Sequence, residues 1–182
     1  MKSDQYKKIE SIFRGSVSRD ELFDTFGEAL KYEIYDFELF KILLANPFIT
    51  IDEIKMYSEK ILKVIPLSSY HILMWTGKIL ESRSYDVENL EDAINYYTRA
   101  INLRPVEFEP LMSLLKLYNH DVESEVNKKI LATVEEGINR VRLKSRVYYA
   151  LADLYKRRGE SNMEFKYLEL AEKSAVNERD EF

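Results

Sequence analysis

The side chains able to do chemistry are few in this sequence, and they lie far apart. The only two histidines are His71 and His120, and neither has a carboxylate at metal-ligand spacing. Neighbouring acids such as Glu91-Asp92 and Glu135-Glu136 point in different directions on a helix, which is typical of a solvated face. The chain has no cysteine, which excludes a thiolate nucleophile, a disulfide framework and a cysteine metal site. We therefore expect no enzyme, with no catalytic residue, metal or cofactor.

Composition indicates a globular helical protein. The 182 residues are 46% hydrophobic and 32% charged, which is enough to bury a core. With only five glycines and four prolines, the chain favours long helices over a β-sandwich or barrel. The net charge of −5 is spread along the sequence and argues against a general nucleic-acid binder. The polar start MKSDQYKKIESIFRG is unlike a signal peptide, and no apolar run approaches the roughly 20 residues of a membrane span, so we expect a cytoplasmic protein.

The clearest structural pattern lies in residues 70–105, which read as two amphipathic helices joined by a polar turn and ended by Pro105. Small residues at Gly77, Ala93 and Ala100 would let the two helices approach closely, with Tyr97 beside them. The apolar positions follow helical spacing: Ile72, Leu73, Thr76, Gly77 and Leu80 in the first helix, and Leu90, Ala93, Ile94, Tyr97, Ala100, Ile101 and Leu103 in the second.

The same pattern recurs twice toward the C-terminus, over residues 108–142 and 145–176. Gly137 takes the small position that Ala100 takes earlier, and Pro110 falls in a first helical turn, where proline is tolerated. Short polar insertions interrupt the pattern near Ser84–Val87 and Asp121–Glu123. In the last copy, Phe165 and Leu168 continue the apolar pattern, and Glu164 stands where a small residue is usual. The residues that match the repeated positions are Tyr148, Leu151, Ala152, Tyr155, Gly159 and Ala171.

These three copies resemble the tetratricopeptide repeat (TPR), a helix-turn-helix unit of about 34 residues. The resemblance implies an all-α fold of antiparallel helix hairpins, a TPR-like solenoid, with three repeats in residues 67–182. It also implies a non-enzymatic protein–protein interaction scaffold that binds a partner segment in its concave groove. Two alternatives remain: a small cytoplasmic chaperone resembling those of type III secretion, or a regulatory subunit of an enzyme or transcription complex.

The resemblance also implies which residues line the groove, because the first helix of each repeat faces it. A Met floor is adaptable, and the rows beside it carry charges of both signs. Each of these positions equally fits an ordinary exposed helix site. Some TPR proteins hold a C-terminal carboxylate, but the combination of residues here does not match that use. The expected rows are Met74, Met112 and Tyr149, then Lys78, Lys116 and Asp153, then Glu81, Asn119 and Lys156.

Residues 1–66 form a separate segment with a heavy aromatic load. We expect helices at 3–14, at 19–32 with a capping box from Ser18 to Glu21, at 36–45, and from Thr50 or Asp52 to Pro66. The apolar face of the second is expected to include Phe23. Residues 36–66 read as a degenerate hairpin. The segment is expected to cap the array; the alternatives are a homodimer contact through residues 19–45 and an independent domain.

Residues 40–62 and Trp75 each allow a second interpretation. Residues 40–62 resemble the first half of a winged helix-turn-helix, but an apolar helix follows where a basic recognition helix is needed. We therefore expect a protein or peptide partner, no nucleic acid and no direct membrane insertion. Trp75, the only tryptophan, lies one residue from the buried stripe. It is expected either to anchor a partner or to pack on a neighbouring repeat.

Overall fold

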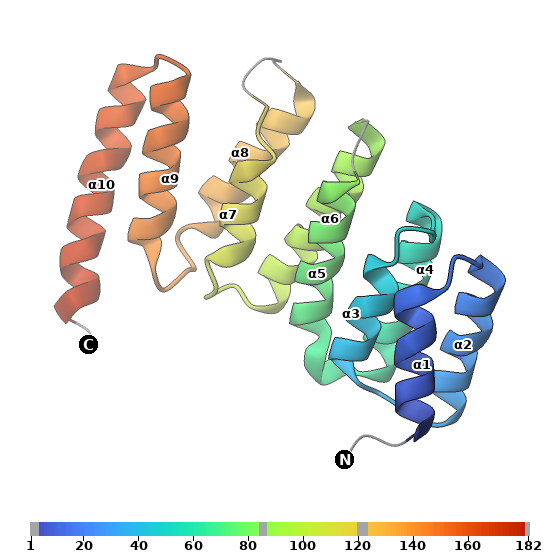
Figure 1. The fold of residues 1–182 in the computed structure, drawn as a ribbon. Helices are drawn as coiled ribbons and strands as arrows, with labels where there is room; N and C mark the ends of the chain where they lie inside the picture. Colours follow the sequence, from blue (N-terminus) through green and yellow to red (C-terminus); the bar gives the residue numbers. More distant parts are fainter. Residues whose placement is uncertain (1–3, 84–86, 120–123, 181–182) are drawn as a thin grey trace. The chain divides into compact units, whose positions relative to one another are not determined.

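The computed structural model of the chain confirms the all-α class. It describes residues 4–83, 87–119 and 124–180, and none of these forms a strand. Residues 84–86 and 120–123, which hold most of the two predicted insertions and His120, lie outside the described ranges. The helices are α1 (Asp4–Gly15), α2 (Arg19–Lys31), α3 (Phe37–Ala45), α4 (Ile51–Val64), the short η1 (Pro66–Ser68), α5 (Ser69–Ser82), α6 (Val87–Leu103), α7 (Glu109–Lys116), α8 (Glu125–Gly137), α9 (Lys144–Arg157) and α10 (Ser161–Asp180) (Figure 1).

The chain divides into two compact units, which we call unit 1 (Met1–Asn89) and unit 2 (Leu90–Phe182). The division falls inside residues 70–105, the stretch that the sequence pattern treats as one repeat. The predicted boundary near residue 66 marks a change of pattern, and it stays a prediction.

Unit 1 is built from helix hairpins whose first helices touch. Helix α1 packs on α2 and on α3, α3 packs on α4 and α5, and α4 packs on α5. The Phe26 ring meets Phe40 and Tyr57 edge-on, with centroids 5.7 and 4.8 Å apart. The hydroxyls of Ser58 and Thr76 are hydrogen-bonded at 2.8 Å between α4 and α5. Most of the core is fully buried: Ile9, Phe13, Leu22, Leu39, Phe40, Leu43, Ile54, Tyr57, Ile61 and Ile72.

The helix starts in unit 1 follow the predicted caps, with one correction. Thr50, not Asp52, caps α4, and it forms a full capping box with Glu53. Ser18 caps α2 by accepting the Glu21 N–H at 3.3 Å, but the Glu21 carboxylate does not return to the Ser18 backbone. Ser16 intervenes, because its hydroxyl donates to Glu21 and accepts the Ser18 N–H. The predicted box at Ser18 is therefore half formed.

One predicted apolar face in unit 1 is wrong in part. Phe23 was expected on the apolar face of α2, but its side chain is 56% exposed. The buried face of α2 is instead made by Leu22, Thr25, Phe26 and Ala29. Helix α2 contacts α1 along that one face, so a residue one step beyond Leu22 turns to the solvent.

The loop between α3 and α4 is held by two side chains that bind backbone. Asn46, which is buried, donates to the carbonyls of Phe13 and Ser16 at 3.0 and 3.1 Å and accepts the Phe48 N–H at 2.9 Å. The Arg83 guanidinium donates to the carbonyls of Ile49 and Asn46 at 2.7 and 2.6 Å. These bonds replace partners that the carbonyls after a helix end would otherwise lack.

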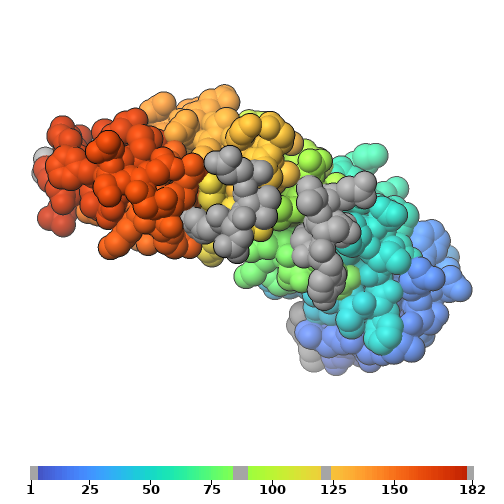
Figure 2. Space-filling model, turned by 90° about the horizontal axis from the view of Figure 1, so that it is seen from above, coloured from blue at the N-terminus to red at the C-terminus, as the bar shows by residue number. Residues whose placement is uncertain are grey.

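Unit 2 repeats the hairpin arrangement. Helix α7 packs on α8 and on α9, and α9 packs on α10; α9 and α10, coloured orange to red, form one closely packed surface (Figure 2). A β-carbon on Gly137 of α8 would lie 2.7 Å from the Leu111 side chain of α7, so a larger residue there would require Leu111 to move. Fully buried residues of this unit include Ala93, Ile94, Ala100, Leu111, Leu114, Ile130, Val134, Val147, Leu151 and Ala171.

The last helix has a different buried face from the predicted one. Ala171 is buried as expected, together with Tyr167, but Phe165 is 70% exposed and Leu168 is also exposed. Within unit 2, α10 packs chiefly on α9, so its outer side faces solvent. The N-terminus of α9 lacks a side-chain cap of its own, and Glu178 of α10 supplies one by accepting the N–H and the hydroxyl of Ser145.

Candidate functional site

The residues expected to bind a partner meet most clearly between the first helices of the two hairpins in unit 2. A cavity of about 300 Å³ lies there, and we call it the α7–α9 hollow. Its lining combines an apolar base with charged side chains at the rim: Met112, Leu115, Lys116 and Tyr118 on one side, and Ala150, Asp153, Leu154 and Arg157 on the other.

Helical spacing explains how both walls form. Met112 and Lys116 are four residues apart on α7, so they share a face, while Leu111 and Leu114 turn into the core. On α9, Ala150, Asp153 and Arg157 follow the same spacing. Proline at the first turn of α7 fixes the start of the wall, because a missing N–H is tolerated at that position.

The charges of this hollow are unequally paired. Asp153 forms an ion pair with Arg157 at 2.9 Å, and both side chains are exposed. Lys116 is exposed and has no ion pair with any described residue. Beside the hollow, Arg158 donates to the Tyr118 hydroxyl at 2.6 Å, pairs with Glu160 at 2.6 Å and stacks over the Tyr155 ring. Within the described ranges, Lys116 is therefore the one cation of the lining without an ion-pair partner.

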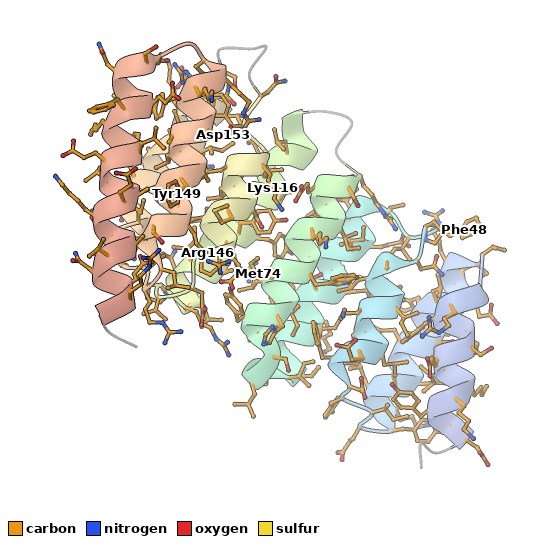
Figure 3. The ribbon with its side chains drawn as sticks, turned by 60° about the vertical axis from the view of Figure 1, so that its left-hand side comes forward. Phe48, Met74, Lys116, Arg146, Tyr149 and Asp153 are labelled. Atoms are coloured by element: carbon orange, nitrogen blue, oxygen red, sulfur yellow. The ribbon has the colours of Figure 1, made fainter. Side chains whose placement is uncertain are left out.

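Three of the predicted groove residues are thus brought together: Met112, Lys116 and Asp153. Figure 3 shows Lys116 on α7 beside α9, which carries Tyr149 and Asp153. Tyr149 is 45% exposed on α9 and does not line the hollow itself. Lys156 is likewise exposed on α9 and outside the lining.

Asn119, the third predicted groove residue of this repeat, lies just beyond helix α7, and its role in a groove stays a prediction. Helix α7 ends at Lys116, so Asn119 follows the helix and does not lie on its face. Its backbone N–H donates to the Asn127 side chain at 3.1 Å, and its carbonyl accepts from the same side chain at 2.7 Å. Buried Asn127 thereby holds the end of the α7 segment to α8.

The remaining predicted groove residues belong to α5 of unit 1. Lys78 is exposed there, and Met74 and Glu81 are half-buried. Whether they continue the row of unit 2 stays a prediction.

A second cavity, which sequence reasoning missed, lies in unit 1. It measures about 500 Å³, and we call it the α1–α3 hollow. Trp75 of α5 forms part of its wall, with its indole N–H donating to the Lys41 carbonyl at 3.3 Å. The Lys41 ammonium lies 4.7 Å from the Trp75 ring centre. Trp75 therefore packs against α3. The lining residues are Tyr6, Glu10, Phe13, Arg14, Glu38, Lys41, Ile42, Ala45, Asn46, Pro47 and Trp75.

The cations of the α1–α3 hollow both have partners. Arg14 pairs with Glu10 at 2.8 Å, and Lys41 pairs with Glu38 at 3.0 Å. Both pairs can be predicted from the sequence, because their members are four and three residues apart. The sequence does not show that the two pairs share one cavity, because this depends on packing between helices some 30 residues apart.

The described residues contain a single histidine, His71, and no cysteine. They hold no group of three or more histidine, cysteine, aspartate or glutamate side chains that could bind a metal ion. His71 is exposed beside the rings of Phe37 and Tyr70, at 6.0 and 5.4 Å. Among the helices in the described ranges, none has both the length and the apolar character to cross a membrane.

The strongest pKa shifts belong to packed tyrosines. Burial, with a smaller contribution from Glu53, raises the pKa of Tyr57 to about 12, and its hydroxyl has no hydrogen-bond partner among the described residues. Burial and a 3.0 Å hydrogen bond to Glu135 raise the pKa of Tyr167. Neither phenol lines the α7–α9 or the α1–α3 hollow. These shifts therefore bear on stability.

Comparison with known proteins adds no identity: a scan against protein-family models and searches of curated proteins and of solved structures find no significant match.

Proposed function

We propose that this chain is a non-enzymatic protein-binding module whose α7–α9 hollow receives a segment of a partner protein. The observation that carries the proposal is the convergence of Met112, Lys116 and Asp153 on one cavity. These residues were expected to bind because of their place in the repeat pattern, and they come from two different hairpins. The resemblance to tetratricopeptide repeats, whose first helices line the binding surface, supports the same role.

The chemistry of the hollow suits a peptide side chain. Its base is apolar, with Met112, Leu115 and Leu154, and its charged groups stand at the rim. An apolar base excludes water from an inserted side chain, while rim charges orient the chain that carries it. Met112 adds adaptability, since an unbranched thioether side chain fits partners of different shape.

We also propose that the hairpins α7–α8 and α9–α10 are tetratricopeptide-type repeats. Gly137 lies against Leu111 where the pattern calls for a small residue. Ala152 and Ala171 are buried in the second hairpin. For a cysteine-free chain with a charged surface, we propose a cytoplasmic location.

Site-specific photocrosslinking tests the proposed binding site. A benzophenone amino acid at Met112 should give adducts with one or a few partner proteins in the source cell, identified by mass spectrometry. Ala132, exposed on α8, is the matched control position and should give none of these adducts. The same adducts at both positions, or no adduct at Met112 from a folded protein, would contradict the proposal.

A further inference from the structure

We infer that the segment seated in the α7–α9 hollow is acidic and carries an apolar side chain beside its carboxylate. This inference rests on the proposed function and names the chemistry of the partner. The apolar side chain would contact Met112 and Leu154, and the carboxylate would pair with Lys116.

Charge in unit 2 is divided between the helices that line the hollow and those behind them. Helix α9 carries Lys144, Arg146, Lys156 and Arg157 against Asp153 alone, a formal charge of +3. Helix α7 has one acid and one base. By contrast, α8 has three acids and two bases, and α10 has five acids and three bases. In a chain of net charge −5, α9 is a local basic element.

The ion pairs inside the hollow show which group of a partner would bind to this excess of positive charge. Two cations line the hollow, and one of them, Arg157, forms an ion pair with Asp153. Lys116 has no carboxylate partner among the described residues. A partner carboxylate reaching Lys116 would therefore gain an ion pair without breaking one. Arg146, whose guanidinium lies 5.0 Å from the Phe108 ring centre, extends the positive field along α9.

Other partners fit these groups less well. A basic segment would find Asp153 as the single carboxylate of the lining, and Arg157 already occupies it. A nucleic acid would match Lys116 and Arg146 but has no aliphatic side chain for the base of the hollow. It would also meet the acidic surroundings of α8 and α10. An acidic segment with an apolar residue satisfies both the base and the rim.

Selection from a random-peptide phage library tests this inference on the full chain. The library is panned on the wild type after depletion on the Met112→Glu variant. Enriched peptides should be net negative and contain an apolar residue next to Asp or Glu. Synthetic versions should bind about tenfold more weakly to Lys116→Glu. Lys129→Glu, the same charge change at an exposed site on α8, should leave the affinity unchanged.

The outcomes separate the two proposals. Basic or uncharged peptides that bind Lys116→Glu as well as wild type would overturn the acidic preference and leave the protein-binding role standing. Competition by a mixed-sequence single-stranded DNA as strong as by the acidic peptide would also overturn it, since the surface would then be a general anion site. Failure to find any peptide that distinguishes wild type from folded Met112→Glu would overturn the proposed function itself. Circular dichroism of each variant excludes loss of fold as the cause.

Discussion

Both hollows lie between first helices of successive hairpins, but they differ in how their cations are used. In the α1–α3 hollow, Arg14 and Lys41 each face a carboxylate from the same helix, and Lys41 also lies over Trp75. In the α7–α9 hollow, Arg157 is paired, but no described residue forms an ion pair with Lys116. Both cations of the larger cavity thus have a carboxylate partner, whereas one cation of the smaller cavity has none among the described residues.

The difference shows why size alone does not identify a binding site. A partner carboxylate entering the α1–α3 hollow would have to displace Glu10 or Glu38, so it would exchange one ion pair for another. At Lys116 the incoming charge meets a cation that pairs with none of the described residues. A new ion pair adds to affinity when the protein cation had no ion-pair partner before binding. It adds little when the ligand only replaces an existing carboxylate partner.

The largest expected effect is on binding. Met112→Glu combined with Tyr149→Glu should weaken a partner bound in the α7–α9 hollow by about a hundredfold, near 3 kcal/mol. The first change puts a charge into the lining, and the second puts one on the exposed surface of α9, next to Ala150 of the lining. The matched change in unit 1, Ala45→Glu, puts a carboxylate into the α1–α3 hollow and should leave the affinity unchanged. Equal losses in both variants, measured by calorimetry, would remove the distinction between the hollows.

Replacing a buried asparagine in each unit tests how much its hydrogen bonds contribute to the free energy of unfolding. Asn46→Ala should destabilise the chain by about 1–3 kcal/mol, because it leaves two carbonyls and one N–H without their partner. Asn127→Ala removes the partner of the Asn119 N–H and carbonyl and should also be destabilising. Urea unfolding followed by circular dichroism measures both. Unchanged stability in either variant would show that water replaces the lost hydrogen bonds at no cost.

Two helical glycines should respond in opposite directions. Gly27→Ala on α2 meets nothing within 4 Å and should stabilise by about 0.5–1 kcal/mol, through the lower entropy of the unfolded chain. Gly137→Ala should destabilise by about 1 kcal/mol, because its β-carbon would overlap the fully buried Leu111. Paired thermal melts give the comparison. Stabilisation by both substitutions would mean that the α7–α8 contact yields without strain.

The smallest effects concern two buried tyrosines. At neutral pH, Tyr57→Phe should change stability by less than about 1 kcal/mol, since its hydroxyl has no partner to lose. Tyr167→Phe should be destabilising, because it breaks the bond to Glu135.

The raised pKa of Tyr57 should also make the stability of the chain depend on pH in the alkaline range. Its pKa is about 12 in the folded chain, against 10.0 as the ordinary value. The unfolded chain therefore releases the proton first, so this stabilisation is full below pH 10 and is lost as the pH rises toward 12. Stability measured from pH 9 to pH 12 should fall less steeply in Tyr57→Phe than in wild type. Identical slopes would show that the phenol ionises as freely in the folded chain.

Local sequence signals predicted much of the fold. The cap at Thr50 and the stop at Asn46-Pro47 set the bounds of α3 and α4 to within a residue or two. Periodicity also located most core positions. It failed at Phe23 and Phe165, because a helix covered on one side buries only part of its apolar residues.

The candidate site was predictable only where it follows the repeat pattern. Met112, Lys116 and Asp153 were placed by register alone. Helix α7 ends at Lys116, so Asn119 follows the helix, and its place in a binding groove stays a prediction. No local sequence pattern predicts the α1–α3 hollow, because its Trp75–Lys41 contact joins residues 34 apart through helix packing. Short-range pairs such as Glu38 and Lys41 are readable, but the cavity they border is not.

The most direct test of the account uses the single tryptophan as a reporter. Trp75 lines the α1–α3 hollow and not the α7–α9 hollow. A fluorescein-labelled acidic peptide selected on the wild type is titrated by anisotropy, and an unlabelled copy is titrated by Trp75 emission. We predict saturable binding that Met112→Glu abolishes, with Trp75 emission unchanged. Emission that shifts in proportion to binding, together with full binding by Met112→Glu, would place the peptide in the α1–α3 hollow and contradict the account.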